Sequence, residues 1–167
     1  GLWKVEKDGK LGFIDKSGKM VIETQFDDVG AFNEGLAWVK KDGKVGFIDK
    51  SGKMVIEPQF DGASDFSEGL AQVEKDGKWG FIDKSGKMVI EPQFDDAGYF
   101  SEGLWKVEKD GKYGFIDKSG KVVIEPQFDD AFSFSEGFAQ VEKDGKYGFI
   151  DKSGKVVIEP QFDNVFD

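Results

Sequence analysis

Acidic side chains are the residues of this chain that could carry chemistry, and they recur at a fixed interval. One aspartate opens the same Asp-Lys-Ser-Gly segment five times, each copy 34 residues after the last, at Asp15, Asp49, Asp83, Asp117 and Asp151. Five equivalent carboxylates could form an ion-binding circle. An aspartate that starts a turn, and pairs with the lysine four residues on, explains the same residue and spacing. We favour this structural role.

A second acidic group follows each copy. Doublets occur at Asp27-Asp28, Asp95-Asp96 and Asp129-Asp130, and the matching positions elsewhere are Asp61-Gly62 and Asp163-Asn164. Their oxygens could bind calcium, but starting a loop or capping a helix suits aspartate better. Glycoside hydrolysis needs one site that separates two carboxylate pKa values, which five near-equal repeats do not offer. We predict no catalytic residue, no metal site and no cofactor.

The rest of the composition excludes most other chemistry. The chain has no cysteine or histidine, and its 23 basic residues are all lysine, which removes disulfides, thiolate or imidazole ligands and arginine clamps. A formal charge of −10 disfavours nucleic acid and membrane partners. No apolar run approaches the ~20 residues of a membrane helix, and residues 1–5 lack a signal-peptide pattern. We expect a soluble chain of unknown compartment, in a trimmed or engineered form that starts at a repeat boundary.

The 34-residue period organises the elements that must position these side chains. The period gives units 1–34, 35–68, 69–102, 103–136 and 137–167 of a single repeat domain. Tetratricopeptide helix pairs share this period. However, four recurring glycines per unit, with β-branched and aromatic residues between them, oppose helices and favour short strands. The sequence therefore predicts an all-β protein built from five three-stranded antiparallel meanders.

Two registers compete for the first turn of each meander. In the third unit we predict strands over residues 70–74, 78–83 and 87–91, the last ending before a proline that removes an amide donor. The first turn is either a two-residue hairpin centred on Asp76-Gly77 or a type I turn with Gly77 as a left-handed bulge. We favour the bulge because it gathers the apolar side chains on one face.

The favoured register makes specific pairs. It places Val73 opposite Trp79 and Ala71 opposite Phe81. At the second turn it pairs Asp83 with Lys87, Ile82 with Met88 and Phe81 with Val89. The predicted structural turn and bulge residues are the glycines of both turns in all five units: Gly9, Gly43, Gly77, Gly111, Gly145, Gly18, Gly52, Gly86, Gly120 and Gly154.

Stacking between units must supply the core, because one meander cannot cover itself. The segment that joins consecutive units has apolar residues three apart, compatible with a helical turn or a wrapped loop. Phe94 and Phe100 are the predicted plugs between repeats of the third unit. Their equivalents in the other units are Phe26 and Phe32, Phe60 and Phe66, Phe128 and Phe134, and Phe162.

Taken together, these residues resemble the bacterial WG-repeat family, also called KWG repeats. The resemblance is carried by Gly-Lys-Trp-Gly-Phe-Ile-Asp at residues 77–83, by Ile-Glu-Pro-Gln-Phe-Asp at 90–95 and by Phe-Ser-Glu-Gly-Leu-Ala-Gln-Val at 66–73. It covers all five units. The signature tryptophan is present at Trp79, and the other units carry Leu11, Val45, Tyr113 and Tyr147 there. The resemblance implies a repeat protein of a family whose roles are diverse.

Neither terminal unit is polarised, since apolar residues such as Trp3 in the first and Phe149 in the fifth are kept. Open stacks normally end in polar caps. We therefore predict a closed, propeller-like ring in which the fifth unit packs on the first, with a monomer favoured if it closes. An open β-solenoid is the alternative.

The predicted function is that of a non-enzymatic scaffold, designed or consensus-engineered. The alternative is a natural bacterial interaction module that binds peptides or glycans in grooves between repeats. Most aromatic side chains, including Tyr99 and Trp105, are expected to pack in the core. Trp38 is the candidate exposed contact, because its position is filled elsewhere by Lys4, Gln72, Lys106 and Gln140.

Overall fold

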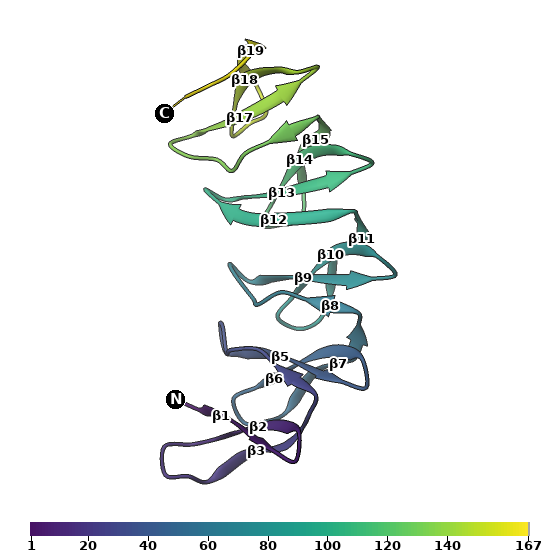
Figure 1. Cartoon of the computed structure of the whole chain (residues 1–167), viewed down its shortest axis with the longest axis vertical. Coiled ribbons are helices and arrows are strands. Elements are labelled where there is room, and N and C mark those ends of the chain that lie inside the picture. Colours follow the sequence, from purple (N-terminus) through teal and green to yellow (C-terminus); the bar gives the residue numbers. More distant parts are fainter. Residues whose placement is uncertain (167) are drawn as a thin grey trace. The chain divides into compact units, whose positions relative to one another are not determined.

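The computed structural model describes residues 1–166. All the regular secondary structure in that part of the chain is β-strand. The strands form five separate antiparallel sheets (Figure 1). This confirms the predicted all-β fold of five tandem repeats, with three or four strands in each. The chain divides into two compact units, Gly1–Pro92 and Gln93–Asp167.

Each sheet is a meander, with its strands side by side in chain order. Sheet 1 contains β1 (Trp3–Lys7), β2 (Lys10–Ile14) and β3 (Met20–Phe26). Sheet 2 contains β4 (Asp28–Val29), β5 (Leu36–Lys41), β6 (Lys44–Asp49) and β7 (Met54–Phe60). Sheet 3 contains β8 (Gly62–Ala63), β9 (Leu70–Lys75), β10 (Lys78–Asp83) and β11 (Met88–Phe94). Sheet 4 contains β12 (Asp96–Ser101), β13 (Leu104–Lys109), β14 (Lys112–Asp117) and β15 (Val122–Phe128). Sheet 5 contains β16 (Asp130–Ala131), β17 (Phe138–Lys143), β18 (Lys146–Asp151) and β19 (Val156–Phe162).

The fourth strand of sheets 2 to 5 was not predicted. The connecting segment was expected to be a helical turn or a loop, but it begins with a short strand that joins the next sheet. In sheet 2, Val29 lies opposite Val39, and the Gly30 N–H donates to the Trp38 carbonyl at 2.9 Å. Pairing with the edge of β5 satisfies backbone groups that a loop would leave to water. Each four-stranded sheet therefore combines residues of two consecutive sequence units.

The favoured register of the first turn is wrong. In sheet 3, Trp79 lies opposite Glu74 and Gly80 lies opposite Val73, which is the two-residue hairpin that the sequence left as the alternative. Asp76 and Gly77 have φ of 52° and 80°, so both central residues are left-handed, as a type I′ turn requires. Gly77 and its equivalents are therefore turn residues and not bulge residues.

The register prediction failed because it assumed that one face of the meander is apolar, whereas both faces are covered. In sheet 2, Ala37, Val39 and Ile48 pack with residues of sheet 1. On the opposite face, Leu36 and Phe47 pack with residues of sheet 3. The hairpin register separates these two sets, and the bulged register would mix them.

The second turn matches its prediction at the turn itself. In sheet 2 the Gly52 N–H donates to the Asp49 carbonyl at 3.0 Å, and the Asp49 N–H donates to the Lys53 carbonyl at 3.0 Å. This is the pattern of a type I turn followed by a left-handed glycine. Beyond it, Phe47 lies opposite Ile56. The predicted pairing of this phenylalanine with the preceding valine is wrong, because a bulge shifts the ladder.

A second register shift, between Val45 and Phe47, explains the prolines. β7 and β11 continue through Pro58 and Pro92, whereas the proline was expected to end the strand. Proline is tolerated here because a bulge leaves one residue outside the ladder. The glycine opposite is required: a Cβ on Gly46 would lie 2.3 Å from the Ile56 carbonyl oxygen and 2.6 Å from the Pro58 nitrogen.

The core lies between consecutive sheets. We call the side of a sheet that packs on the preceding sheet its leading face and the side that packs on the following sheet its trailing face. In sheet 1 the trailing face contains Phe13, Ile22 and Phe26, which are 2–4% exposed. Six of the predicted plugs lie in such clusters: Phe26, Phe32, Phe60, Phe66, Phe128 and Phe134. The ring of Phe32, for example, packs edge-on against Phe13, with centroids 5.1 Å apart. The prediction is wrong for Phe162, which is 45% exposed.

Within Gly1–Pro92, sheets 1, 2 and 3 follow one another in order, and within Gln93–Asp167 sheet 5 follows sheet 4 (Figure 1). Sheets 4 and 5 share a buried apolar cluster that includes Phe115, Phe128 and Ile150. No closed sheet occurs among residues 1–166. Closure of the five repeats into a ring stays a prediction.

Candidate functional site

The five turn aspartates do not come together as an ion-binding group; each is used within its own turn. Asp49 accepts hydrogen bonds through Oδ1 from the Ser51 N–H at 2.9 Å, the Ser51 hydroxyl at 2.6 Å and the Lys53 N–H at 3.0 Å. The other four turns repeat this arrangement. The lysine four residues on therefore contributes its backbone N–H to the aspartate.

The first aspartate of each doublet joins two consecutive sheets. Asp27 binds the Lys10 amine of its own sheet through Oδ1, and its Oδ2 accepts the Asp42 N–H of the next sheet at 2.9 Å. Equivalent contacts from the N–H groups of the next turns reach Asp61, Asp95 and Asp129 at 2.7–2.9 Å. We call each of these contacts a carboxylate latch. The second aspartate bonds locally, as Asp28 does with the Val29 N–H at 2.9 Å.

These contacts predict acid sensitivity of the fold. The hydrogen bond from Ser51 lowers the pKa of Asp49, and the Lys10 amine followed by the Asp42 N–H lowers the pKa of Asp27. A carboxyl group whose pKa is lower in the folded state stabilises the fold above its unfolded pKa of about 3.9 and loses that contribution as pH falls through the folded pKa. We expect a constant melting temperature from pH 7 to about 5, and a progressive fall below about pH 4.

Circular dichroism melts across this range provide the measurement. The variant Asp49→Asn keeps an oxygen acceptor but cannot titrate, so its melting temperature should fall less between pH 5 and pH 3 than that of the unmodified chain. A variant as acid-sensitive as the parent would show that the turn carboxylate does not contribute to the pH dependence.

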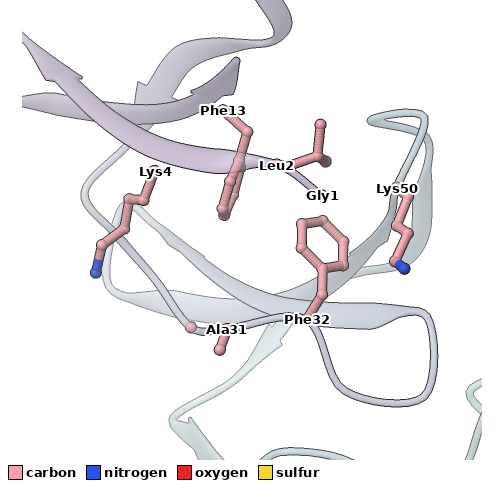
Figure 2. Close-up of a pocket in the computed structure, with 8 residues that line it drawn as sticks. Gly1, Leu2, Lys4, Phe13, Ala31, Phe32 and Lys50 are labelled. Carbon is pink, nitrogen blue, oxygen red and sulfur yellow. The ribbon is translucent and has the colours of Figure 1, made fainter. Parts of the chain in front are cut away.

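One open pocket of about 390 Å³ lies within the unit Gly1–Pro92, beside the first interface between sheets (Figure 2). Phe13 of β2 and Phe32, which precedes β5, line it with their rings in edge-on contact, and Leu2 lies beside them. The side chains of Lys4 and Lys50 lie on either side of these rings. Apolar walls flanked by two amines suit a ligand that combines an apolar group with an anion.

The predicted contact residue Trp38 is half-buried. Its ring lies against Gly30 of the neighbouring strand segment, where an added Cβ would come within 2.2 Å of the indole Nε1. The ring also packs against the cluster between sheets 2 and 3. Because Gly30 has no side chain, the indole of Trp38 has room to lie against it. The role of Trp38 as a surface contact stays a prediction.

The exposed aromatic side chains lie at other positions. Tyr99 is 88% exposed and Trp3 is 57% exposed, whereas both side chains were expected to pack in the core. Trp105 is 3% exposed and lies 4.3 Å from the Phe100 ring, centroid to centroid. Nothing in the sequence distinguishes Tyr99 from the packed aromatic residues, because its exposure follows from the register of β12 against β13.

The ten predicted turn glycines have φ between 77° and 89°.

Among residues 1–166, no three or more acidic side chains gather in a group that could hold a metal ion. No helix in the part of the chain that the structure describes could span a membrane. At the turns and latches that the structure describes, the repeated carboxylates accept backbone N–H groups, and lysine amines bind the latch carboxylates.

The fold and its contacts define an all-β tandem-repeat protein. The family described as "WG containing repeat" matches residues 12–44, 46–79, 79–113, 113–147 and 147–167. The chain therefore belongs to the WG-repeat family. No curated protein matches it.

Solved structures resemble the chain only distantly. The extracellular domain of a one-component system from B. thetaiotaomicron is 13% identical with a TM-score of 0.41 over 95% of this chain, which spans 28% of that domain. A plant lectin with two metal-binding sites from Cicer arietinum is 16% identical with a TM-score of 0.31, over 83% of this chain and 89% of the lectin. A symmetrical protein of de novo evolutionary emergence is 10% identical with a TM-score of 0.36, over 95% of this chain and 90% of that one.

Proposed function

We propose that this chain is a non-enzymatic repeat scaffold, and that its near-identical units reflect consensus design or engineering. One observation carries the proposal: the recurring polar side chains are used to join the chain to itself. The turn aspartates hold their own turns, and Asp27, Asp61, Asp95 and Asp129 hold the turn of the next sheet. A structure in which each unit performs the same structural task can gain or lose units without losing a unique site.

Removal of one unit tests this proposal. Deleting residues 35–68 joins residue 34 to residue 69, where the chain already has an equivalent junction. We expect a folded, cooperative protein with the same circular dichroism spectrum per residue and a lower melting temperature, because one inter-sheet interface is lost.

The matched control deletes half a period, residues 35–51. This deletion brings unlike strands together and shifts the register of every later pair, so we expect an unfolded or aggregated product. A full-period deletion that behaves as badly as the half-period deletion would contradict the scaffold proposal, because the units would then not be interchangeable.

The second candidate function is a bacterial interaction module that binds peptides or glycans between repeats. The pocket formed by Leu2, Phe13 and Phe32 with Lys4 and Lys50 supports it. Glycan-array and peptide pull-down measurements on the intact chain, compared with Trp38→Ala, provide the test. Binding that depends on Trp38 would favour the module, and five equivalent units without a ligand would favour the scaffold.

The closed ring predicted from the sequence is a finer form of the fold. Both terminal sheets present apolar side chains to solvent, and a ring would cover them with residues of the same copy. Small-angle scattering checks it, because a ring has a smaller radius of gyration than an open array of the same five units.

A further inference from the structure

The terminal sheets of the described chain present two apolar faces that have no partner within their own compact units. Sheet 1 packs on sheet 2 by its trailing face, and its leading face is turned away from that contact. Sheet 5 packs on sheet 4 by its leading face, and its trailing face is turned away. Sheet 2, by comparison, is covered on both sides, by residues of sheet 1 and of sheet 3. The two exposed end faces are therefore one leading face and one trailing face.

The trailing face of sheet 5 has the composition of a buried interface. Its Ile158 and Phe162 are 38% and 45% exposed, whereas Ile124 and Phe128 at the same positions of sheet 4 are 2% and 3% exposed. Phe138 is also 46% exposed. A contiguous set of large apolar side chains of this kind marks an interaction surface.

The leading face of sheet 1 is the matching half. The residues that correspond to the buried Ala37, Val39 and Ile48 of sheet 2 are Trp3, Val5 and Ile14. Trp3 is 57% exposed, and the other two are half-buried. Sheet 1 also lacks the fourth strand that each of the other described sheets has, so β1 is an edge strand.

Residues 163–166 have the positions of that missing strand. In sheets 2 and 5 the first strand follows the aspartate of the carboxylate latch, and its second residue lies opposite a valine of the adjacent strand, as Val29 lies opposite Val39 and Ala131 opposite Val141. By the same count Val165 matches Val29 and Val5 matches Val39. Residues 163–166 have no strand partner in the structure.

The carboxylate latch repeats this correspondence. Asp163 binds the Lys146 amine as Asp27 binds that of Lys10. Its other oxygen is the one that, in the four earlier copies, accepts an N–H from the next hairpin turn. The turn that corresponds to it in sheet 1 offers the N–H of Asp8.

We propose that the two end faces join between copies of this chain: residues 163–166 of one copy add to β1 of a second copy as the fourth strand of its sheet 1, with Val165 opposite Val5 and Asp163 latched to the Asp8 N–H. The trailing face of sheet 5 then covers Trp3, Val5 and Ile14. The joint continues the interface that the chain builds between its own sheets, combining strand addition with apolar packing. Because the two surfaces differ, the contact is head-to-tail and extends from copy to copy.

Cysteine cross-linking tests the joint, since the chain has no cysteine of its own. Two single variants, Val5→Cys and Val165→Cys, are mixed under mild oxidation. Residues directly opposite each other on antiparallel strands are close enough for a disulfide. We expect the disulfide-linked dimer of one Val5→Cys chain with one Val165→Cys chain to be the main product. The control replaces Val5→Cys by Glu6→Cys, whose side chain points to the other face of β1, and should give little of this product.

The double variant Val5→Cys/Val165→Cys separates the possible sources of the strand. Disulfide-linked dimers and longer ladders on non-reducing gels support the proposal. A monomer with an internal disulfide at all protein concentrations would overturn it in favour of the ring. Absence of any cross-link in both experiments would also overturn it, because neither end would then find the other.

A charge placed on the end face provides a second measurement. Phe162→Lys should raise the midpoint concentration of self-association, measured by analytical ultracentrifugation, by about tenfold or more, since it places a charge where a large apolar side chain is buried. Gln161→Lys makes the same charge change on the adjacent residue, whose equivalents Gln25, Gln59 and Gln127 stay exposed beside packed sheets, and should leave the midpoint unchanged. Equal effects of the two variants, or a monomer at all concentrations, would contradict the proposal.

Discussion

Replacing Gly114 with alanine is expected to destabilise the protein more than any other single methyl addition in sheet 4. A Cβ on Gly114 would lie 2.3 Å from the carbonyl oxygen of Ile124 and 2.6 Å from the nitrogen of Pro126. Both atoms belong to the backbone of β15, so no side-chain rotation relieves the contact. The bulge that pairs Phe115 with Ile124 would have to open. We expect a loss of about 3 kcal/mol in the free energy of unfolding, at the upper end of overpacking costs.

Gly98→Ala is the matched control in the same sheet. Its added Cβ meets the flexible side chain of Lys106 at 3.3 Å or more, which can move aside. Urea unfolding of the two variants compares them directly, because both add one methyl group to a glycine of sheet 4. A Gly114→Ala midpoint equal to that of Gly98→Ala would show that β14 and β15 do not approach each other as described.

Replacing Phe47 with alanine should have the largest effect of any side-chain truncation between sheets 2 and 3. Phe47 is fully buried, and its ring packs edge-on against Phe66 with centroids 4.9 Å apart. Truncation of a buried phenylalanine typically costs about 3–5 kcal/mol, because apolar contact is lost and a cavity is left. Chemical denaturation followed by circular dichroism measures the change in unfolding free energy.

Phe149→Ala provides the control at the same repeat position. Phe149 lies on the trailing face of sheet 5 and is only half-buried, so its truncation should cost clearly less than that of Phe47 at concentrations where the chain is monomeric. Equal losses would mean that Phe149 is as well covered as Phe47 in solution. In that case the effect of Phe149→Ala should be measured again in a chain that also carries Phe162→Lys, because the added charge blocks the end face.

The repeat length, the strand content and the two turns of each unit could be predicted from the sequence, because they depend on neighbouring residues. Asp and Gly at Asp76-Gly77, and the Asp-Lys-Ser-Gly segment from Asp83, specify turns through their own backbone preferences. The family followed from the same local motifs. The structural role of Asp83 also followed, since its partners Ser85 and Lys87 lie within four residues.

The register, the fourth strand and the latch could not be predicted, because they depend on what lies above and below each sheet. Val73 lies opposite Gly80, and residue 80 is glycine because the backbone of β11 lies against it and leaves no room for a side chain. Asp27 bonds to Asp42 across 15 residues because the next hairpin turn lies beside it. Neither contact leaves a pattern in the sequence of a single meander.

The sequence by itself determined that this chain forms short strands and tight turns in five equal units, since backbone preference acts over a few residues. Only the tertiary structure decided which side chains of a unit face each neighbour, because burial on both faces allows two apolar sets that one periodic pattern cannot distinguish. It also decided that Ile158 and Phe162, identical in type to buried residues of sheet 4, lie exposed on sheet 5. Burial depends on the neighbouring sheet, and the sequence of one unit carries no record of whether that neighbour is present.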